Sequence, residues 1–485
     1  MLFLLLTASA IAPGGSALEG TWTAQRDYGP RANVVWRNTA KRPHDVEHLL
    51  LYISRNADGS LQAFLRNPEQ NAGARVGTRS VVLSGNVVQL QRADNADITG
   101  AWSPERNTLT LHDPGLPGDF VFSRATESAP APYIYHRPAA GRDGWRTGTL
   151  SAVAISEGAV AHIIDAIRTT APSLRAPYIQ SVLIARHGKL VLDEYFNDFT
   201  AERPHDVRSA GKSVTTLLVG HAIADTHAFS PQTRIASLLT QYAPFANDDS
   251  RKQAITVANL MSMSAGYDCD DNADNSPGGE DQMQSQAAQP DWYKFTLDLP
   301  MLFAPGTRAL YCSAEINLLG AIVSKETGAP LTTYFEQRFG KPMQFREYGM
   351  WLMPPPTSAA YMAGGDLFRP RDFLKFGQLF LNHGRWNGKQ IIDAAWLADS
   401  SAKHSYVEDG GGDYGYGWHL VTYTIHGRTI RAINAGGNGG QLLYIFPQLD
   451  MVVMITAANY GQFPVWHAFQ TDFIPSILAT VDSPK

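Results

Sequence analysis

Ser209 and Lys212 are the first residues of this 485-residue chain whose types and spacing suggest chemistry. They stand in the stretch VRSAGKSVTTLLVG, in which apolar residues recur at helical intervals. Positions i and i+3 share one face of a helix, so we expect the two side chains one turn apart at a helix N-terminus. A serine hydroxyl becomes an effective nucleophile when a neighbour takes its proton, and a lysine buried there can lose its own proton and act as that base. A lysine that stays charged can instead lower the pKa of another group.

The pattern Ser-x-x-Lys is a weak signal by itself, because it occurs a second time at Ser400 and Lys403. That second pair stands where a predicted helix runs into a loop, which indicates coincidence. For the first pair, the structural alternative is an N-cap serine followed by a solvated lysine. We interpret Ser209 and Lys212 as a nucleophile and its partner because an apolar helix follows them directly.

Two further segments carry residues that could complete such a site. The segment FAPGTRALYCSAEINLLG places Tyr311 and Ser313 between a Pro-Gly turn and a predicted helix. A phenol, with an ordinary pKa of about 10, can act as a general base where a lysine lowers that value. In NAGGNGGQLLYIF, four glycines precede a predicted strand, and their backbone can approach a substrate closely and hold an oxyanion. The alternatives are a buried aromatic residue and a flexible turn.

Six segments, in order along the chain, resemble the serine β-lactamase and penicillin-binding-protein superfamily: VRSAGKS, ANLMSMSAGYD, PGTRALYCSAEINLLG, AGGDLFRPRDFLKFGQLFLNHGRWNGKQII, YGYGW and GGNGGQLLYIFPQLDMVVM. The likeness is greatest to the class C-like esterase and 6-aminohexanoate-dimer hydrolase branch, and it covers about residues 150–475. It implies that Ser209 is the nucleophile and Lys212 its partner. It also implies that Tyr311 and Ser313 form the Tyr-x-Asn or Tyr-x-Ser element. The backbone N–H groups of Ser209 and Gln441 would hold the oxyanion.

The chain departs from the superfamily pattern at its third element. β-Lactamases and penicillin-binding proteins usually have Lys-Thr-Gly there, where the charge and the hydroxyl help to hold a substrate carboxylate. This chain has Asn438, Gly439 and Gly440 instead, without a cation. A small ester or a linear amide needs no such anchor, so we predict an esterase or amidase that forms an acyl-enzyme on Ser209. The alternative is a penicillin-binding receptor or β-lactamase that is acylated by β-lactams; neither hypothesis calls for a metal or an organic cofactor.

The pattern of predicted strands and helices divides the chain into two domains. Residues 18–126 contain short β-rich segments separated by turn signals, which predict a small antiparallel barrel or sandwich. Residues 127–150 are rich in Pro, Ala and Gly and are typical of a linker. Residues 151–485 mix helices, loops and strands. The resemblance implies a β-lactamase/transpeptidase-like α+β fold for them, an antiparallel sheet flanked by helices with an all-helical region beside it.

Composition and charge limit the partners of the protein. The chain is 44% hydrophobic and 18% charged, as in globular proteins, and its net charge of −5 with no long basic run argues against nucleic acid. The expected partner is a small-molecule ester or amide, and no oligomeric state is predicted. No later stretch reaches the roughly 18 uninterrupted apolar residues of a membrane helix. Asp268, Asp270, Asn272 and Asp274 are spaced as in a calcium loop, but Ala273 stands where that loop needs glycine, so no metal site is predicted.

The N-terminus and the cysteines bear on the cellular compartment. Leu2 to Ala12 is apolar but too short to span a bilayer, and small residues follow up to Ala17, as in a signal peptide over residues 1–17. This predicts an exported protein, periplasmic or secreted; the alternative is a buried first strand. Export would place the only two cysteines, Cys269 and Cys312, in an oxidising compartment, where a pair tends to close into a disulfide. The alternative is two separate buried thiols.

Overall fold

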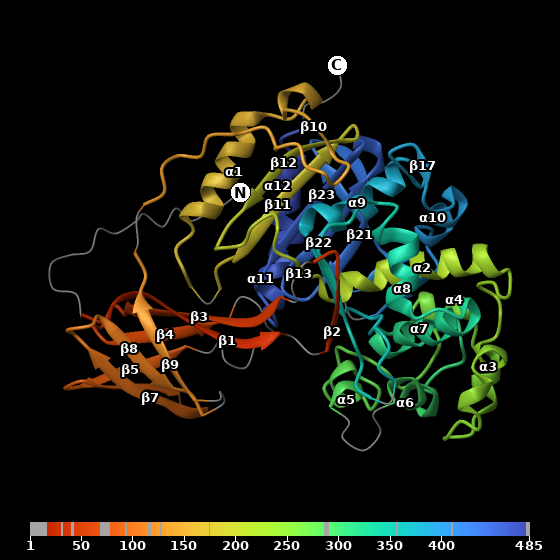
Figure 1. Cartoon of the computed structure of the whole chain (residues 1–485), viewed down its shortest axis with the longest axis horizontal. Helices are drawn as coiled ribbons and strands as arrows, with labels where there is room; N and C mark the ends of the chain where they lie inside the picture. Colours follow the sequence, from red (N-terminus) through yellow and green to blue (C-terminus); the bar gives the residue numbers. More distant parts are fainter. Residues whose placement is uncertain are drawn as a thin grey trace.

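A computed structural model gives the fold of the chain (Figure 1). It describes residues 17–481 except for 31–32, 40–42, 68–77, 93–94, 115–117, 127–128, 174, 286–290, 356 and 409–410. The predicted signal peptide therefore lies outside the described residues, apart from Ala17. Within the described part of the chain, no helix is both long enough and apolar enough to cross a membrane.

The N-terminal strands close into a barrel in the order β1-β3-β4-β5-β6-β7-β8-β9. Their bounds are Gly20–Pro30 (β1), His44–Arg55 (β3), Leu61–Arg66 (β4), Arg79–Ser84 (β5), Val87–Arg92 (β6), Asn95–Ser103 (β7), Thr108–His112 (β8) and Asp119–Arg124 (β9). Inward and outward side chains alternate, as in β9, where Phe120 and Phe122 are buried and Val121 is exposed. A cavity of about 10 Å³ lies among the inward residues. Of the two predicted architectures the barrel is the one that forms, and side chains fill its interior.

Strand β2 (Val34–Arg37) leaves the barrel and joins the second domain. It pairs antiparallel with β14 (Tyr348–Trp351) at the edge of a four-stranded sheet ordered β13-β15-β14-β2. The other two strands are β15 (Asp366–Phe368) and β13 (His205–Asp206), and β13 leads directly into the segment that carries Ser209. Figure 1 shows β2 beside the second domain, apart from the barrel strands. The two domains expected from the sequence thus share a sheet.

A nine-stranded sheet forms the centre of the second domain, in the order β10-β12-β11-β23-β22-β21-β20-β19-β18. The strands are Arg146–Thr147 (β10), Lys189–Tyr195 (β12), Ile179–Arg186 (β11), Met451–Ala457 (β23), Gln441–Phe446 (β22), Arg428–Gly437 (β21), His419–Ile425 (β20), Gly412–Tyr414 (β19) and Ser405–Val407 (β18). Successive residues of a strand face opposite sides. In β11, Val182 lies in the hydrophobic core cluster that contains residues of α1 (Glu157–Thr169). Its neighbour Leu183 lies in the cluster on the other face, which contains residues of α9 (Pro370–Leu381). Helices therefore cover both faces of the sheet.

Most helices gather on one side of this sheet, around α2 (Gly211–Thr226) and α7 (Ser313–Thr327), which pack against each other. The shorter helices are α3 (Ile235–Leu238), α4 (Val257–Met261), α5 (Glu280–Gln284), α6 (Trp292–Asp298), α8 (Leu331–Phe335), α10 (Ala394–Ser400), α11 (Phe463–Ala468) and α12 (Ile474–Leu478). Every residue of α2 from Gly211 to Ala222 is buried. The apolar spacing predicts an amphipathic helix there, but α2 runs through the middle of the domain and has no solvent face over that length. Its polar residues are consequently enclosed by protein.

Candidate active site

Ser209 lies in the short 3-10 turn η3 (Arg208–Ala210) directly before α2, where it is partly exposed. The carboxylate of Asp206 accepts a hydrogen bond of 2.9 Å from the Arg208 N–H. Arg208 has a φ of +50°, which is uncommon for a residue other than glycine. Gly364 lies against this turn, and a Cβ there would come within 3.1 Å of the Ser209 nitrogen. The residue before the candidate nucleophile is thus held in an unfavourable conformation, and such strain is concentrated at functional sites.

Lys212 is the second residue of α2 and is only 1% exposed. Its Nζ donates hydrogen bonds of 2.8 Å to Ser209 Oγ and of 2.8 Å to the carbonyl oxygen of Ala363. Burial pushes the pKa of Lys212 down, but a neighbouring phenol and two carboxylates push it up, and the net pKa is above its ordinary value. Of the two roles considered for this lysine, base or fixed charge, the structure favours the fixed charge.

Tyr311 stands two residues before α7 and faces Lys212, whose Nζ lies 5.0 Å from the ring centroid. The negative charge of the ionised Tyr311 side chain and a side-chain hydrogen bond between the two residues raise the Lys212 pKa. The ring of His419, on β20, stacks on Tyr311 with centroids 6.1 Å apart, and burial lowers the pKa of His419. The structure therefore brings Ser209, Lys212 and Tyr311 together. It adds a neutral imidazole, His419, that no spacing in the sequence singled out.

Ser313, the first residue of α7, is fully buried and bound to Asp271. Its N–H and its hydroxyl both donate to Asp271 Oδ2, at 2.8 and 2.6 Å. Asp271 Oδ1 accepts a hydrogen bond of 2.9 Å from the N–H of Glu280. The N–H of Asp271 in turn donates a hydrogen bond of 2.8 Å to the carbonyl oxygen of Tyr311. Glu280 also accepts a hydrogen bond from the Tyr361 hydroxyl. Two carboxylates thus stand beside the candidate serine–lysine–tyrosine group.

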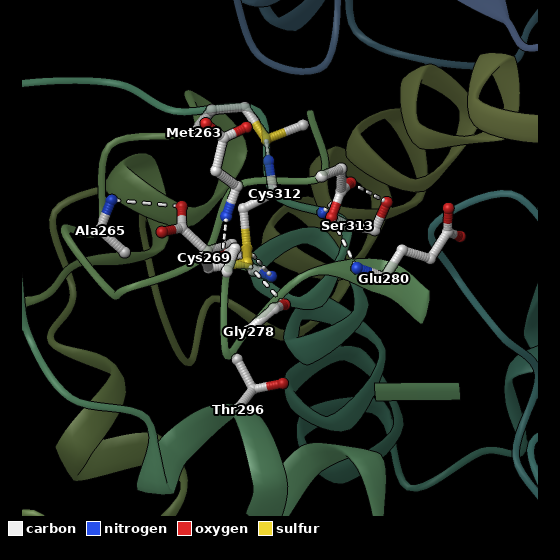
Figure 2. Close-up of a disulfide and its surroundings, with 12 residues drawn as sticks. Met263, Ala265, Cys269, Gly278, Glu280, Thr296, Cys312 and Ser313 are labelled. Carbon is white, nitrogen blue, oxygen red and sulfur yellow. Dashed lines mark hydrogen bonds between the residues drawn. A yellow bond between two sulfur atoms is a disulfide. The ribbon is translucent and has the colours of Figure 1, made fainter. Parts of the chain in front are cut away.

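Cys269 and Cys312 form a disulfide across 43 residues of sequence, with Cα atoms 5.5 Å apart (Figure 2). The structure therefore confirms the predicted disulfide, and the alternative of two separate buried thiols is excluded. Because Cys312 separates Tyr311 from Ser313, the bond ties the acidic loop to the middle of the Tyr-x-Ser element. Figure 2 shows Ser313 next to this bond.

Asp271 and Glu280 are site residues that the sequence did not single out. Residues 268–274 are predicted only as an acidic loop, and Asp271 falls between the positions whose spacing is that of a calcium loop. In the part of the chain that the structure describes, no three His, Cys, Asp or Glu side chains are grouped to hold a metal ion. The one available signal for Asp271 is its place two residues after Cys269, which pairs with Cys312.

The glycines of the third element form the turn between β21 and β22. Gly439 and Gly440 have φ of +93° and +96°, and a Cβ on either would meet an aromatic ring, that of Tyr460 or Phe469, at 2.5 Å. Asn438 Oδ1, in the same turn, accepts a hydrogen bond from a backbone N–H after β23. Glycine is thus required here by both conformation and space.

Gln441, the oxyanion donor expected from the motif, lies at the start of β22 opposite Gly437. It is fully buried, and its Nε2 donates a hydrogen bond of 2.6 Å to the carbonyl oxygen of Ala457. Gly437 is the residue packed against the nucleophile turn, since a Cβ there would lie 2.3 Å from the Val207 oxygen and 3.1 Å from Arg208 Cβ. We therefore take the N–H of Gly437, in place of that of Gln441, as the candidate donor. The glycine run fits the family motif in more than one register, so the sequence alone allows either residue.

A cation lies at this end of the site although the third element contains none. The Arg208 guanidinium carbon is 5.1 Å from the centroid of the Tyr460 ring, the same ring that packs against Gly439. The guanidinium pairs with Asp206 at 3.2 Å, and its side chain is 29% exposed. We expected no recognition of a substrate carboxylate because the third element contains no cation. The nearby positive charge of Arg208 weakens that expectation.

Residues 177–464, more than half of the chain, match the family model described as Beta-lactamase. The chain belongs to the Beta-lactamase family. A curated relative, "Putative D-alanyl-D-alanine carboxypeptidase" of Escherichia coli (strain K12), is 26% identical over 141 residues, which are 29% of this chain. The chain spans about a third of that relative's length, 32%.

Solved structures share the fold of this β-lactamase-family chain. One is the "Putative 6-aminohexanoate-dimer hydrolase from Bacillus anthracis", with a TM-score of 0.53 and 19% identity, covering 63% of this chain and 81% of that chain. Another is "EstCE1, a hydrolase with promiscuous acyltransferase activity", with a TM-score of 0.51 and 17% identity, covering 66% and 97%. The predicted superfamily and its α+β fold are confirmed.

Proposed function

We propose that this β-lactamase-family enzyme hydrolyses small esters or linear amides through an acyl-enzyme on Ser209. The observation that carries the proposal is the 2.8 Å hydrogen bond from the buried Lys212 amine to the Ser209 hydroxyl. An N-cap serine followed by a solvated lysine would not have this arrangement. The folds of the hydrolase with promiscuous acyltransferase activity and of the putative 6-aminohexanoate-dimer hydrolase support the substrate class by analogy.

Acylation begins with attack of Ser209 Oγ on the carbonyl carbon of the substrate. In the reacting form of the site Lys212 is the ammonium ion and Tyr311 the phenolate. The serine proton goes to the phenolate oxygen, which becomes a neutral phenol, and the Lys212–Tyr311 pair acts as a unit. Negative charge develops on the carbonyl oxygen, and we assign its stabilisation to the N–H groups of Ser209 and Gly437. The fixed charge of Lys212 lowers the cost of forming an anion anywhere in this group.

Breakdown of the tetrahedral intermediate releases the leaving group and leaves an ester on Ser209. Tyr311 returns the proton to the leaving oxygen or nitrogen, so that an alcohol or an amine departs. Water then attacks the acyl carbon and gives its proton to Tyr311. That proton passes to Ser209 Oγ as the carboxylic acid leaves, which restores the starting state.

A substrate screen tests this proposal directly. We expect the wild-type protein to turn over p-nitrophenyl butyrate and Ser209→Ala to lose that turnover, in a panel that also contains linear amides and nitrocefin. Turnover retained by Ser209→Ala would assign hydrolysis to another group. Wild-type acylation rates in Tyr311→Phe would remove Tyr311 from the mechanism.

A second candidate function, acylation by β-lactams, is favoured by the positive charge of Arg208, whose side chain is partly exposed. A cation near the third element can attract the carboxylate of such a substrate. One equivalent of nitrocefin consumed in a burst, with little turnover afterwards, would indicate a receptor. Sustained turnover would indicate a β-lactamase, and no reaction would leave the esterase or amidase proposal alone.

We also infer that the enzyme is exported and works in an oxidising compartment. The Cys269–Cys312 disulfide supports this, because disulfides persist in secreted and periplasmic proteins and are rare in the cytosol. Fractionation of cells that express the full chain, with alkylation of free thiols before lysis, tests it. Recovery of reduced protein in the cytosolic fraction would contradict the inference.

A further inference from the structure

Asp271 connects three parts of the site that lie far apart in the sequence. One carboxylate oxygen accepts hydrogen bonds from the N–H and the hydroxyl of Ser313, on α7. The other accepts a hydrogen bond from the N–H of Glu280, on α5. Its own N–H donates to the carbonyl oxygen of Tyr311. Two residues earlier, Cys269 is bonded to the residue between Tyr311 and Ser313. Four hydrogen bonds and one covalent link therefore hold this carboxylate in register with the Tyr-x-Ser element.

Four titratable groups on neighbouring elements interact with the charge of Asp271: Lys212 on α2, Glu280 on α5, Glu315 on α7 and Tyr361 in the loop before β15. Burial first, and then the charge of Glu280, raises the pKa of Asp271 to about 6, while Lys212 opposes the rise. One ammonium group thus faces two carboxylates. When Asp271 is ionised, its charge is part of what favours the protonated form of Lys212.

We propose that Asp271 is a positioning residue of this hydrolase, which orients the Ser313 hydroxyl and holds the charge of Lys212 for proton transfer between Ser209 and Tyr311. The inference rests on the proposed acyl-enzyme chemistry at Ser209. A hydroxyl that donates its proton to Asp271 offers only lone pairs to its other neighbours. One such neighbour is Tyr361, whose side chain interacts with Ser313.

Loss of the Asp271 charge has two effects, and both work against catalysis. Ser313 loses an ionic acceptor, and hydrogen bonds to ionised groups are the stronger ones. Lys212 loses one of the two carboxylates that favour its charged form. In the wild-type enzyme kcat should therefore fall as the pH drops through about 6, where Asp271 takes up a proton.

The test compares Asp271→Asn with Asp270→Asn, a matched control. Asp270 is the adjacent carboxylate, partly exposed, and it caps the N–H of Asn272 in the same loop. For Asp271→Asn on p-nitrophenyl butyrate we expect kcat to fall roughly 10- to 100-fold, KM to change by less than about 3-fold, and the decline of kcat near pH 6 to disappear. Asp270→Asn should keep the wild-type kcat and pH profile. A purely structural role would lower the amount of folded protein without removing the pH dependence.

A second pair of variants keeps the inference testable if Asp271→Asn folds poorly. Ser313→Ala should also lower kcat by roughly 10- to 100-fold. In the double variant Asp271→Asn/Ser313→Ala the fall in kcat should be smaller than the product of the two single fold-changes, because both residues act in one hydrogen-bond network. Turnover that survives Ser209→Ala would overturn the proposed function and this inference with it. Ser209-dependent turnover with a wild-type kcat and pH profile in Asp271→Asn would overturn this inference alone.

Discussion

Lys212 Nζ lies 2.8 Å from the hydroxyl oxygen of Ser209, and the lysine is 1% exposed. We predict that Lys212→Met lowers kcat/KM for p-nitrophenyl butyrate by roughly 100-fold or more, the scale of losing one electrostatic stabiliser of the developing charge. The chain supplies its own control in its second Ser-x-x-Lys pair. Lys403 is 55% exposed and pairs with Asp413 at the surface, so Lys403→Met should leave the rate unchanged. Equal effects of the two substitutions would show that the buried hydrogen bond does not matter for turnover.

The disulfide between Cys269 and Cys312 should stabilise the fold as well as the site. Replacing both cysteines by alanine is expected to lower the free energy of unfolding by about 2–4 kcal/mol, because the unfolded chain regains the freedom of the closed loop. Urea unfolding of wild type with and without reductant measures this. The double variant should not respond to reductant; a wild-type midpoint that is insensitive to reduction would contradict the prediction.

Glu315, on α7, is 2% exposed, and burial raises its pKa to about 8. The unfolded chain releases this proton near the ordinary value, so the stability gained from holding it is complete at low pH and is lost as the pH rises through about 8. Glu315→Gln removes the titration. The variant's gain in free energy of unfolding over wild type should therefore grow between about pH 5 and pH 8, by up to ~1.4 kcal/mol per pH unit. A gain that stays constant across these pH values would show that Glu315 does not titrate there.

Strand β2 should be needed for the stability of the second domain. A Cβ at Gly349, on β14, would lie 2.7 Å from a Val34 methyl group and 3.0 Å from the Trp36 ring. Gly349→Ala is therefore expected to lower the free energy of unfolding by about 1–3 kcal/mol through overpacking. Gly158→Ala, in α1 with open space around it, is the matched control and should be neutral or stabilising. A lower Tm for Gly158→Ala than for Gly349→Ala would contradict this account.

Arg208 should set a preference among substrates. If its guanidinium attracts a substrate carboxylate, Arg208→Met should lower kcat/KM for an ester with a terminal carboxylate, such as mono-p-nitrophenyl succinate, about 10-fold more than for p-nitrophenyl butyrate. The neutral ester corrects for any change at the neighbouring Ser209. Equal losses for both esters would limit Arg208 to a structural role.

Features that depend on local spacing could be predicted from the sequence. Ser209 and Lys212 are one helical turn apart, and the ordered segments around them place Tyr311 in the same site. Strand β2 could not be predicted, because a segment of four residues, Val34–Arg37, finds its partner more than 300 residues away in β14. Asp271 carries no motif of its own and is recognisable only through the pairing of Cys269, which spacing alone leaves open. Gly437 and Gln441 lie in one glycine-rich run, where only packing against the nucleophile turn decides between them.

The most direct test of the central claim is mass spectrometry of the protein quenched during turnover of p-nitrophenyl butyrate. The account predicts one butyryl group on the peptide that carries Ser209, formed in wild type and absent in Ser209→Ala. Product release with the acyl group on another residue, or with no acyl group trapped at any time point before steady state, would contradict it.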